Sequence, residues 1–307
     1  MALPPFTLHD PESALDACRM LGDYGDDGAA IAGGTAVLIL MKSGLYRPAH
    51  LVNLKALDTL SEIRFDPQAG LHLGALATHR AVECDPAVRE HYPILSSTYA
   101  RVANVRVRNS ATVGGNLAHG DFRIDPPAPL IALGAKIHLM GTGGERELLL
   151  EDFFTGFYAT AKAEGEIVTA VNVPPPLSGL AGTYLKYVGN AAADWPTLGT
   201  AVMLRTTKGA CEDLRVVLTS VAETPVKVAG LEDLAFGRAL SEDRIEQIAE
   251  AAASQTDPIE DHRGSAWYKR EMVKVHVRRG IEALLASGDT LTVDYDGTSA
   301  QIARGLN

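Results

Sequence analysis

Two glycine segments carry the residues of this chain that are best suited to bind a ligand. AGGT at 32–35 lies where a predicted strand turns sharply into a helix, and TVGGN at 112–116 lies beside another apolar strand. Glycines let a backbone approach an anion closely, and a helix N-terminus offers free N–H groups and the positive end of the helix dipole. In the second segment, Thr112 and Asn116 add a hydroxyl and an amide to successive glycine amides, which can form an anion-binding concavity.

Each segment by itself also fits a simpler interpretation. A glycine pair at the end of a strand is often only a tight turn or a bulge that needs a positive φ. Two such segments, each beside an apolar strand, together favour a diphosphate group held between two lobes of the fold.

The sequence lacks the motifs of the commonest nucleotide sites and of acyl-transfer enzymes. It contains neither GxGxxG, the Rossmann dinucleotide motif, nor GxxxxGK[ST], the P-loop motif. GTGG at 141–144 lies between strand-like segments and is predicted as a hairpin turn. His119 and Asp121 place an imidazole near a carboxylate, but no serine or cysteine lies in a recognisable nucleophile setting such as GxSxG. We interpret both as polar lining of the second glycine segment and expect no catalytic acid or base.

The remaining polar candidates have weaker patterns. Asp125 either accepts a hydrogen bond from a ligand hydroxyl or caps the helix predicted after it. His79 and Cys84 lack ligand spacing with any partner, so no metal site is expected. The one basic cluster is typical of a solvated face and consists of Arg101, Arg106 and Arg108.

Composition excludes several classes of function. The chain has 307 residues, with 28 basic and 38 acidic side chains and a formal net charge of −10. Nucleic acids and anionic membranes need clustered Lys and Arg, so an acidic chain is a poor candidate for binding them. The three cysteines (Cys18, Cys84 and Cys211) are far apart and form no CxxC. We therefore expect no disulfide framework and no iron–sulfur cluster in this chain, and a cytoplasmic location fits.

No segment predicts export or a membrane span. The N-terminus shows no basic leader before an apolar run, and the longest near-apolar stretch (29–41) is too short to cross a bilayer.

Apolar periodicity predicts the elements that position the two glycine segments. Up to the second segment we expect a helix capped by Asp10 and ending before Gly22, a strand at 29–32, a buried helix at 36–41, strands at 51–54 and 71–75, and a helical region at 78–105. From there we expect a glycine-rich loop at 111–120, a helix at 129–133, a hairpin of 135–140 and 147–150, strands at 167–173, 183–188, 199–205 and 214–221, helices at 241–254 and 265–286, and a short strand at 291–293.

The proline triplet at 174–176 is the clearest domain boundary. It separates a nucleotide-domain candidate, residues 1 to about 177, from a smaller domain of a sheet and helices. The predicted fold class is α+β.

The order and spacing of several longer motifs resemble a known family. Along residues 3–286 the chain contains AGGTAVLILMKSG, LVNL, LHLGALATHRAVE, VRNSATVGGNLAHGD, LIALGAKIHL and EDFFTG. This series resembles the FAD-binding medium subunit of molybdenum hydroxylases, the flavoprotein of the xanthine dehydrogenase and carbon monoxide dehydrogenase group. The resemblance implies a vanillyl-alcohol-oxidase/PCMH-like FAD-binding fold. It implies FAD-binding subdomains at 1–58 and 59–177, a flavoprotein C-terminal domain at 178–287 and a tail extension at 288–307.

The resemblance also assigns cofactor-binding positions. From the first segment it implies a pyrophosphate cradle of Ala30, Ile31, Ala32, Gly33, Gly34, Thr35, Ala36 and Val37. The second segment would contribute Thr112, Gly114, Gly115 and Asn116. Asp125 would bind ribityl or ribose hydroxyls, Val168 and Lys186 would contact the flavin, and Trp195 would lie near the isoalloxazine ring.

Two positions depart from the family pattern. Relatives often carry serine where this chain has Ala36, and Phe122 replaces a proline that commonly follows Asp121. Neither change removes a backbone cradle, but the first removes a possible phosphate hydroxyl.

The function implied is electron transfer within a heteromeric enzyme. A large subunit would carry molybdopterin, a small subunit would carry [2Fe–2S] clusters, and this chain would pass electrons through FAD to quinone, NAD or oxygen. A dimer of heterotrimers is the expected assembly. Two alternatives remain open: a stand-alone FAD-dependent oxidoreductase of the same fold, and a nucleotide-binding scaffold in which the flavin only stabilises assembly.

Overall fold

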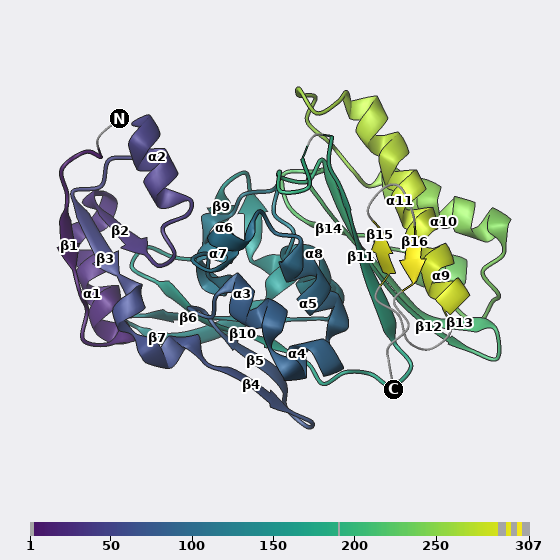
Figure 1. The fold of residues 1–307 in the computed structure, drawn as a ribbon, viewed down its shortest axis with the longest axis horizontal. Coiled ribbons are helices and arrows are strands. Elements are labelled where there is room, and N and C mark those ends of the chain that lie inside the picture. Colours follow the sequence, from purple (N-terminus) through teal and green to yellow (C-terminus); the bar gives the residue numbers. More distant parts are fainter. Residues whose placement is uncertain (1–2, 190, 288–292, 296–299, 303–307) are drawn as a thin grey trace.

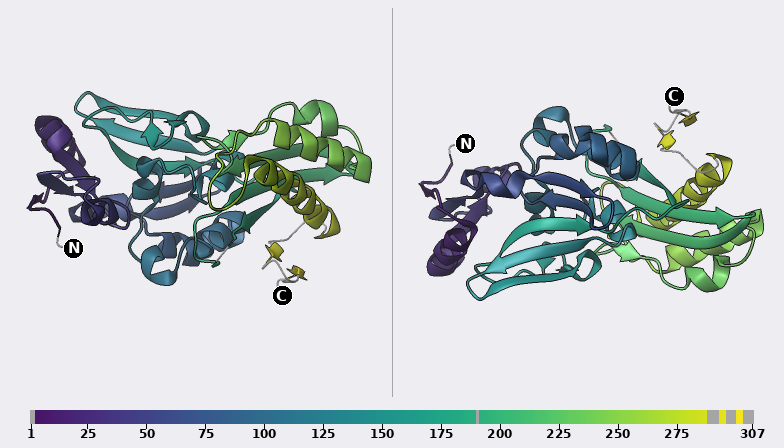
Figure 2. Two further views of the ribbon diagram at one scale, coloured as in Figure 1. Left: turned by 90° about the horizontal axis from the view of Figure 1, so that it is seen from above. Right: turned by 90° about the horizontal axis from the view of Figure 1, so that it is seen from below.

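The computed structural model describes residues 3–189, 191–287, 293–295 and 300–302 and arranges three main sheets in a row (Figures 1 and 2). The N-terminal sheet lies at the left of Figure 1, a five-stranded sheet in the middle and a four-stranded sheet at the right.

The first sheet is parallel, in the order β1-β3-β2. Its elements are β1 (Thr7–His9), α1 (Ala14–Tyr24), β2 (Gly28–Ile31), α2 (Val37–Ser43) and β3 (His50–Asn53). The N-cap of α1 is Ser13, whose hydroxyl accepts a hydrogen bond from the Asp16 amide at 3.1 Å. The predicted cap Asp10 was therefore wrong, because its carboxylate accepts from the Asn53 side chain at 2.7 Å.

The second sheet is antiparallel, in the order β4-β5-β10-β6-β7. Its strands are β4 (Ile63–Asp66), β5 (Gly70–Gly74), β6 (Lys136–Gly141), β7 (Gly144–Leu149) and β10 (Ile167–Val173). The hairpin predicted around GTGG is confirmed, since β6 and β7 pair down to Gly141 and Gly144. A small separate ribbon is formed by β8 (Phe154–Gly156) and β9 (Ala159–Thr160).

The helical region predicted at 78–105 is divided by prolines. It consists of α3 (His79–Cys84), α4 (Pro86–His91), α5 (Pro93–Ala100) and, separately, α6 (Val105–Arg108). Pro86 and Pro93 each stand at the first turn of a new helix. A proline has no N–H to continue a helix but is preorganised to begin one, so the chain turns at both positions.

The second glycine segment is helical, which corrects the predicted loop. Residues Val113–His119 form α7, with Thr112 as N-cap and Gly120 ending it at φ +65°. Two glycines within the first turn do not prevent the helix, because a Thr cap and packing on β5 fix its start. The next helix, α8, spans Pro127–Ala132.

The third sheet is covered on both faces. Its strands are antiparallel, in the order β11 (Ala181–Tyr187), β12 (Leu198–Thr207), β13 (Ala210–Thr219) and β14 (Val226–Lys227). Along β12, Val202 and Leu204 belong to the core under the C-terminal helices, whereas Ala201 and Met203 belong to the core of the second sheet. Side chains alternate between the faces of a strand, so β12 joins the two cores. The C-terminal helices are α9 (Leu231–Ala235), α10 (Glu242–Ser254) and α11 (Ala266–Ser287).

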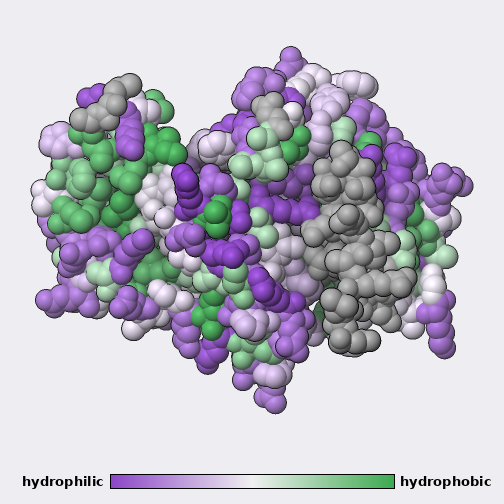
Figure 3. All heavy atoms as spheres, viewed as in Figure 1, coloured by the Kyte–Doolittle hydropathy of each residue, from purple (hydrophilic) through white to green (hydrophobic). Residues whose placement is uncertain are grey.

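The last described strands are β15 (Val293–Tyr295) and β16 (Ala300–Ile302), which pair with each other. Of the strand predicted at 291–293, only Val293 falls among the described residues. Figure 3 shows hydrophobic side chains gathered on the N-terminal lobe, where Ile39 and Leu45 are 60% and 79% exposed. The helix predicted as buried at 36–41 is thus buried on one side only. No helix in the described ranges is both long and apolar enough to span a bilayer.

Candidate functional site

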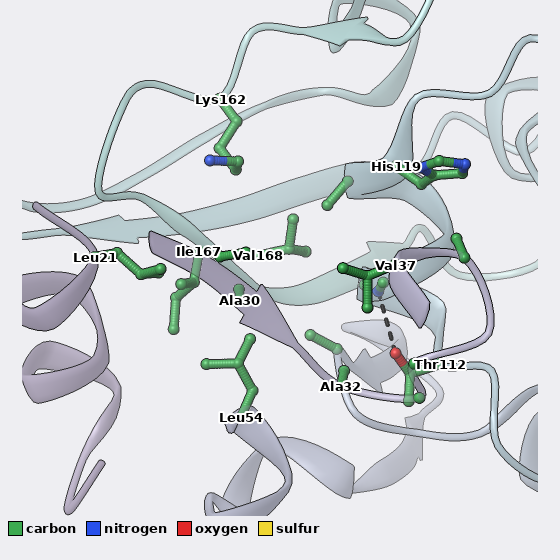
Figure 4. A pocket seen from close by; sticks show the side chains of 18 of the residues that line it. Leu21, Ala30, Ala32, Val37, Leu54, Thr112, His119, Lys162, Ile167 and Val168 are labelled. Carbon is green, nitrogen blue, oxygen red and sulfur yellow. Dashed lines mark hydrogen bonds between the residues drawn. The ribbon is translucent and has the colours of Figure 1, made fainter. Parts of the chain in front are cut away.

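A cavity of about 520 Å³ lies between the first lobe and the second sheet, and both glycine segments belong to its wall (Figure 4). Its wall also includes residues of α1, of the loop before β10 and of β10 itself. Twelve of the sixteen predicted cofactor residues line it: Ala30, Ala32, Gly33, Gly34, Thr35, Ala36, Val37, Thr112, Gly114, Gly115, Asn116 and Val168.

The first glycine segment connects β2 to α2 and keeps its backbone donors free. Within the described part of the chain, no hydrogen bond is donated by the amides of residues 33–37. Their carbonyls are partly used, since Gly34 and Ala36 accept from Leu38 and Leu40. Gly34 has φ +70°, a conformation that side-chain-bearing residues rarely adopt. The segment therefore presents a row of five unpaired N–H groups to the cavity wall, as an anion site requires.

Gly33 is required by a contact with protein. A Cβ added at Gly33 would lie 2.0 Å from the Ser110 carbonyl oxygen, so only glycine permits this approach. Ser110 immediately precedes the second glycine segment, and the contact therefore holds the two segments together.

The second glycine segment uses its amides within the protein. Val113 and Gly114 donate to the carbonyls of Ala77 and Ala75 at 2.9 and 2.8 Å. Gly115 donates to the Thr112 hydroxyl oxygen at 3.1 Å, the dashed line in Figure 4, and Asn116 donates to the Thr112 carbonyl. The predicted concavity of free glycine amides at this segment was therefore wrong, because the helix start and its neighbouring loop take these donors.

Side chains are what the second segment offers to a ligand. The amide oxygen of Asn116 is buried and has no hydrogen-bond partner among the described residues. The Thr112 hydroxyl accepts from Gly115, and its own hydrogen remains available. His119 also lines the cavity, as predicted, and burial lowers its pKa while the Asp121 carboxylate opposes that shift. A neutral imidazole can both donate and accept a hydrogen bond.

Asp125 and Lys186 do not line this cavity but pair with each other, Lys186 from β11 of the third sheet and Asp125 from the chain just before α8. Lys186 Nζ lies 3.2 Å from the Asp125 carboxylate and donates to the Arg101 carbonyl at 3.0 Å. The Tyr184 hydroxyl donates to the other Asp125 oxygen at 2.7 Å. Burial raises the pKa of Asp125 and Lys186 opposes the shift. Asp125 does not cap α8, whose N-cap position is Pro126.

Two further predicted residues also lie away from the cavity wall. Ile31 ends β2, and Trp195 lies between β11 and β12 with 49% of its surface exposed. The basic cluster predicted as a solvated face is only partly one: Arg106 is exposed, but Arg108 is largely buried and pairs with Glu83 at 2.9 Å.

Sequence reasoning missed the apolar part of the wall. Leu21, Leu54 and Ile167 line the cavity together with Lys162. The three apolar residues have the periodicity of ordinary core positions, and Lys162 stands in a polar loop, so no local pattern distinguishes them.

Two family models match the chain in succession. The FAD binding domain in molybdopterin dehydrogenase matches residues 4–176, and the CO dehydrogenase flavoprotein C-terminal domain matches residues 183–284. The carbon monoxide dehydrogenase medium chain of Hydrogenophaga pseudoflava is 32% identical over 286 residues, which cover 93% of this chain and 99% of the relative. The glyceraldehyde dehydrogenase medium chain of Sulfolobus acidocaldarius is 30% identical over 272 residues, covering 89% and 95%.

Solved structures agree with these matches. A carbon monoxide dehydrogenase from Hydrogenophaga pseudoflava that lacks the Mo-pyranopterin moiety of its molybdenum cofactor is similar with a TM-score of 0.90 and 33% identity, covering 94% of this chain and 100% of that one. Quinoline 2-oxidoreductase from Pseudomonas putida 86 gives a TM-score of 0.87 at 30% identity, covering 94% and 99%. The predicted α+β fold is confirmed, and this chain belongs to the FAD-binding medium subunits of the molybdenum hydroxylases, a family of oxidoreductases.

Proposed function

We propose that this chain is the electron-transfer subunit of a heteromeric molybdenum hydroxylase. It takes electrons from the [2Fe–2S] clusters of a small subunit and passes them to an external acceptor such as quinone, NAD or oxygen. A separate large subunit carries the molybdopterin, and the assembly is a dimer of heterotrimers. The observation that carries the proposal is the cavity wall formed by five unpaired backbone amides between two lobes.

The residues of the cavity fit the diphosphate of FAD. A diphosphate accepts several hydrogen bonds, and the amides of residues 33–37 are donors without another partner in the described chain. Asn116 supports the same assignment, because its buried unpartnered oxygen would cost stability without a ligand. FAD, when bound, supplies the redox chemistry, and the protein supplies binding, orientation and electrostatics.

We assign the flavin end to the side of the cavity that adjoins the third sheet. His119 lies in the wall on that side, and the chain continues from it to Phe122, whose carbonyl accepts from the Ser220 amide at 3.1 Å. Asp125 follows Phe122 by three residues, and its carboxylate contacts Tyr184 and Lys186 of the third sheet. In this proposal the Asp125–Lys186 pair binds the ribityl and flavin portion, and Trp195 covers the ring.

The same proposal divides the chain by sheet. Subdomains 1–58 and 59–177 hold the dinucleotide between the first and second sheets, and residues 178–287 cover the flavin with the third sheet. Residues 288–307 form a tail extension to this arrangement.

In this proposal, partner subunits carry the molybdopterin and the iron–sulfur clusters. Relatives named medium chain indicate complexes of several chains, and the cysteines Cys18, Cys84 and Cys211 are far apart in this sequence. All three are free, which suits the reducing cytoplasm that we propose as the location.

Native purification with subunit, metal and flavin analysis tests the proposal. We expect this chain to copurify with a molybdenum-containing large subunit and an iron–sulfur small subunit, and to hold one FAD. The isolated chain should bind FAD but turn over no organic substrate. Turnover of an organic substrate by the isolated chain would favour the stand-alone oxidoreductase, and absence of both FAD and partners would contradict the subunit proposal altogether.

A further inference from the structure

Lys162 stands in the cavity wall at the end away from the free amides. It lies in the connection from β9 to β10, and Figure 4 shows its side chain above Ile167 and Val168, on the side of Leu21. Figure 4 places Val37, Thr112 and His119 at the opposite end. The end near Lys162 is walled by aliphatic side chains, namely Leu21, Leu54, Ile167 and Val168.

The Lys162 ammonium is only weakly engaged by the protein. The one hydrogen bond that it makes to a described residue is to the carbonyl of the adjacent Ala163, at 3.3 Å. Glu166 is already occupied, because it accepts two 2.7 Å bonds from the Arg146 guanidinium and one from the Ala163 amide. No ion pair of Lys162 occurs among the described residues, although Asp26 and Glu164 also belong to the cavity wall.

Burial destabilises the charged form of the Lys162 side chain. It lowers the pKa of Lys162, and the Glu166 carboxylate opposes that shift from a distance. A partly buried donor with spare hydrogens lowers the stability of the protein unless a ligand accepts from it. The geometry therefore indicates a ligand acceptor at this end of the cavity.

The identity of that acceptor follows from the direction of the dinucleotide, and it rests on FAD binding in this cavity as proposed above. The diphosphate lies at the free amides, and the flavin points to the third sheet. The adenosine half then occupies the end with Leu21 and Leu54, and Val168, which the resemblance assigned to the flavin, lies beside the adenosine half instead. Adenine has two apolar faces and acceptor nitrogens along its edge, which match an aliphatic wall beside the Lys162 donor.

We infer that Lys162 is a specificity-determining residue for the cofactor, and that its side chain donates a hydrogen bond to a ring nitrogen of adenine. It is then a polar group that fixes the adenine at an end of the cavity where Leu21, Leu54 and Ile167 form the apolar wall.

The test compares full-length chain freed of FAD with its variants K162M and K136M. Lys136 is the matched control, because it lies on β6, outside the cavity wall, with 48% of its side chain exposed. Affinities are measured for FAD, and by competition for ADP, adenosine and FMN. We expect K162M to weaken the affinities for FAD, ADP and adenosine by a similar factor of about tenfold, the usual effect of one lost hydrogen bond to a charged donor. K136M should change each affinity by less than about twofold.

FMN separates the two ends of the cavity. Its affinity should be the same in K162M and in the unchanged protein, because FMN has no adenine. K162R, which keeps a donor, should recover part of the loss, and the ligand-free K162M chain should melt at the same temperature or higher, because it loses a partly buried ammonium.

Several results would overturn the inference. A loss for ADP without a loss for adenosine would place Lys162 on a phosphate, and a loss for FMN would place it at the flavin end. Unchanged affinities in K162M would show that Lys162 contacts no ligand. If the unchanged protein binds no FAD, the proposed function fails, and this outcome is distinct from a failure of K162M alone.

Discussion

In the first glycine segment, residues 32–35, and the two residues that follow it, no amide from Gly33 to Val37 donates a hydrogen bond within the described chain. In the second, residues 112–116, the four amides after Thr112 are all bonded to protein oxygens. Both segments have a glycine pair at the start of a short helix, just before α2 in the first and within the first turn of α7 in the second, and both line one cavity. They resemble each other in sequence but differ in which hydrogen bonds remain available.

The difference follows from the neighbours of each segment. The second segment starts α7 against the loop after β5, and Gly114 permits this packing, since its Cβ would lie 2.6 Å from the Ala75 Cβ. The first segment turns away from β2, and the backbone of Ser110 and Ala111, just before the second segment, lies against Gly33. A glycine pair therefore indicates that another group approaches the backbone closely, but only the fold decides whether that group is protein or ligand.

The largest effect is expected where the two segments touch. In G33A the added Cβ would meet the Ser110 carbonyl, a backbone group that cannot swing aside. Overpacking of this kind costs up to about 3 kcal/mol, so FAD affinity should fall by about 100-fold, measured by titration of the FAD-free chain. The control is G143A, because no atom lies within 4 Å of a Cβ built at Gly143. Unchanged affinity in G33A would show that the segments do not need this contact.

Acid should lower the stability of the protein through His79, which lies beside the second segment. His79 is fully buried, its amide donates to the Ala111 carbonyl, and burial lowers its pKa to about 4 from 6.5. Between these values the unfolded chain binds a proton that the folded chain does not, so stability falls as the pH falls, by about 2 kcal/mol at pH 5. Urea unfolding at pH 7 and pH 5 measures this loss.

The variant H79F should reduce the pH dependence by that amount, since Phe does not titrate. His276 in α11 also has a pKa lowered to about 4 by burial, so H276F should reduce the pH dependence similarly without affecting the glycine segments. An equal loss of stability in H79F and the unchanged protein would contradict the role given to His79.

A smaller effect is expected from the Asn116 side chain, which lines the cavity. In N116A the cavity loses the amide whose oxygen has no protein partner, and FAD affinity should fall by about tenfold, measured by fluorescence titration. N109A, at an exposed position just before the segment, is the matched control and should change affinity by less than about twofold. A fall in both variants would assign the effect to the loop rather than to a ligand contact.

The smallest effect is a gain at the first segment. Ala36 stands at the N-cap position of α2 without a side-chain cap bond, and it lines the cavity. In A36S a hydroxyl joins the free amides, and FAD affinity should rise by about threefold, since a cap or hydrogen bond of this kind contributes about 0.5–1 kcal/mol. Isothermal calorimetry on the FAD-free chain measures the change. A weaker affinity would mean that the amides need the full space beside Ala36.

Local patterns predicted most elements of the fold because they depend on neighbours in sequence. The strand at 167–173 has the bounds of β10, and the helices predicted at 241–254 and 265–286 match α10 and α11 within one residue. The single helical region predicted at 78–105 was wrong at Pro86 and Pro93, where new helices begin. The apolar spacing continues across both prolines, although a proline cannot continue a helix.

The residues of the candidate site were predicted less accurately than the helices and strands. The first segment and Val168 lie in the cavity wall, whereas Asp125 and Lys186 pair with each other outside it. Their pairing joins β11 of the third sheet to the chain just before α8, and no spacing along the chain encodes such a contact. Lys162 and Leu54 were missed for the same reason, since each looks ordinary beside its sequence neighbours.

The sequence alone determined the family, the α+β class and the positions of both glycine segments, because glycines, prolines and apolar periods act over a few residues. The tertiary structure decided which backbone amides stay free, since Val113 and Gly114 lose theirs to Ala77 and Ala75, far away in the chain. It also decided which polar side chains line the cavity. A hydrogen bond needs two partners in contact, and only the folded chain fixes both.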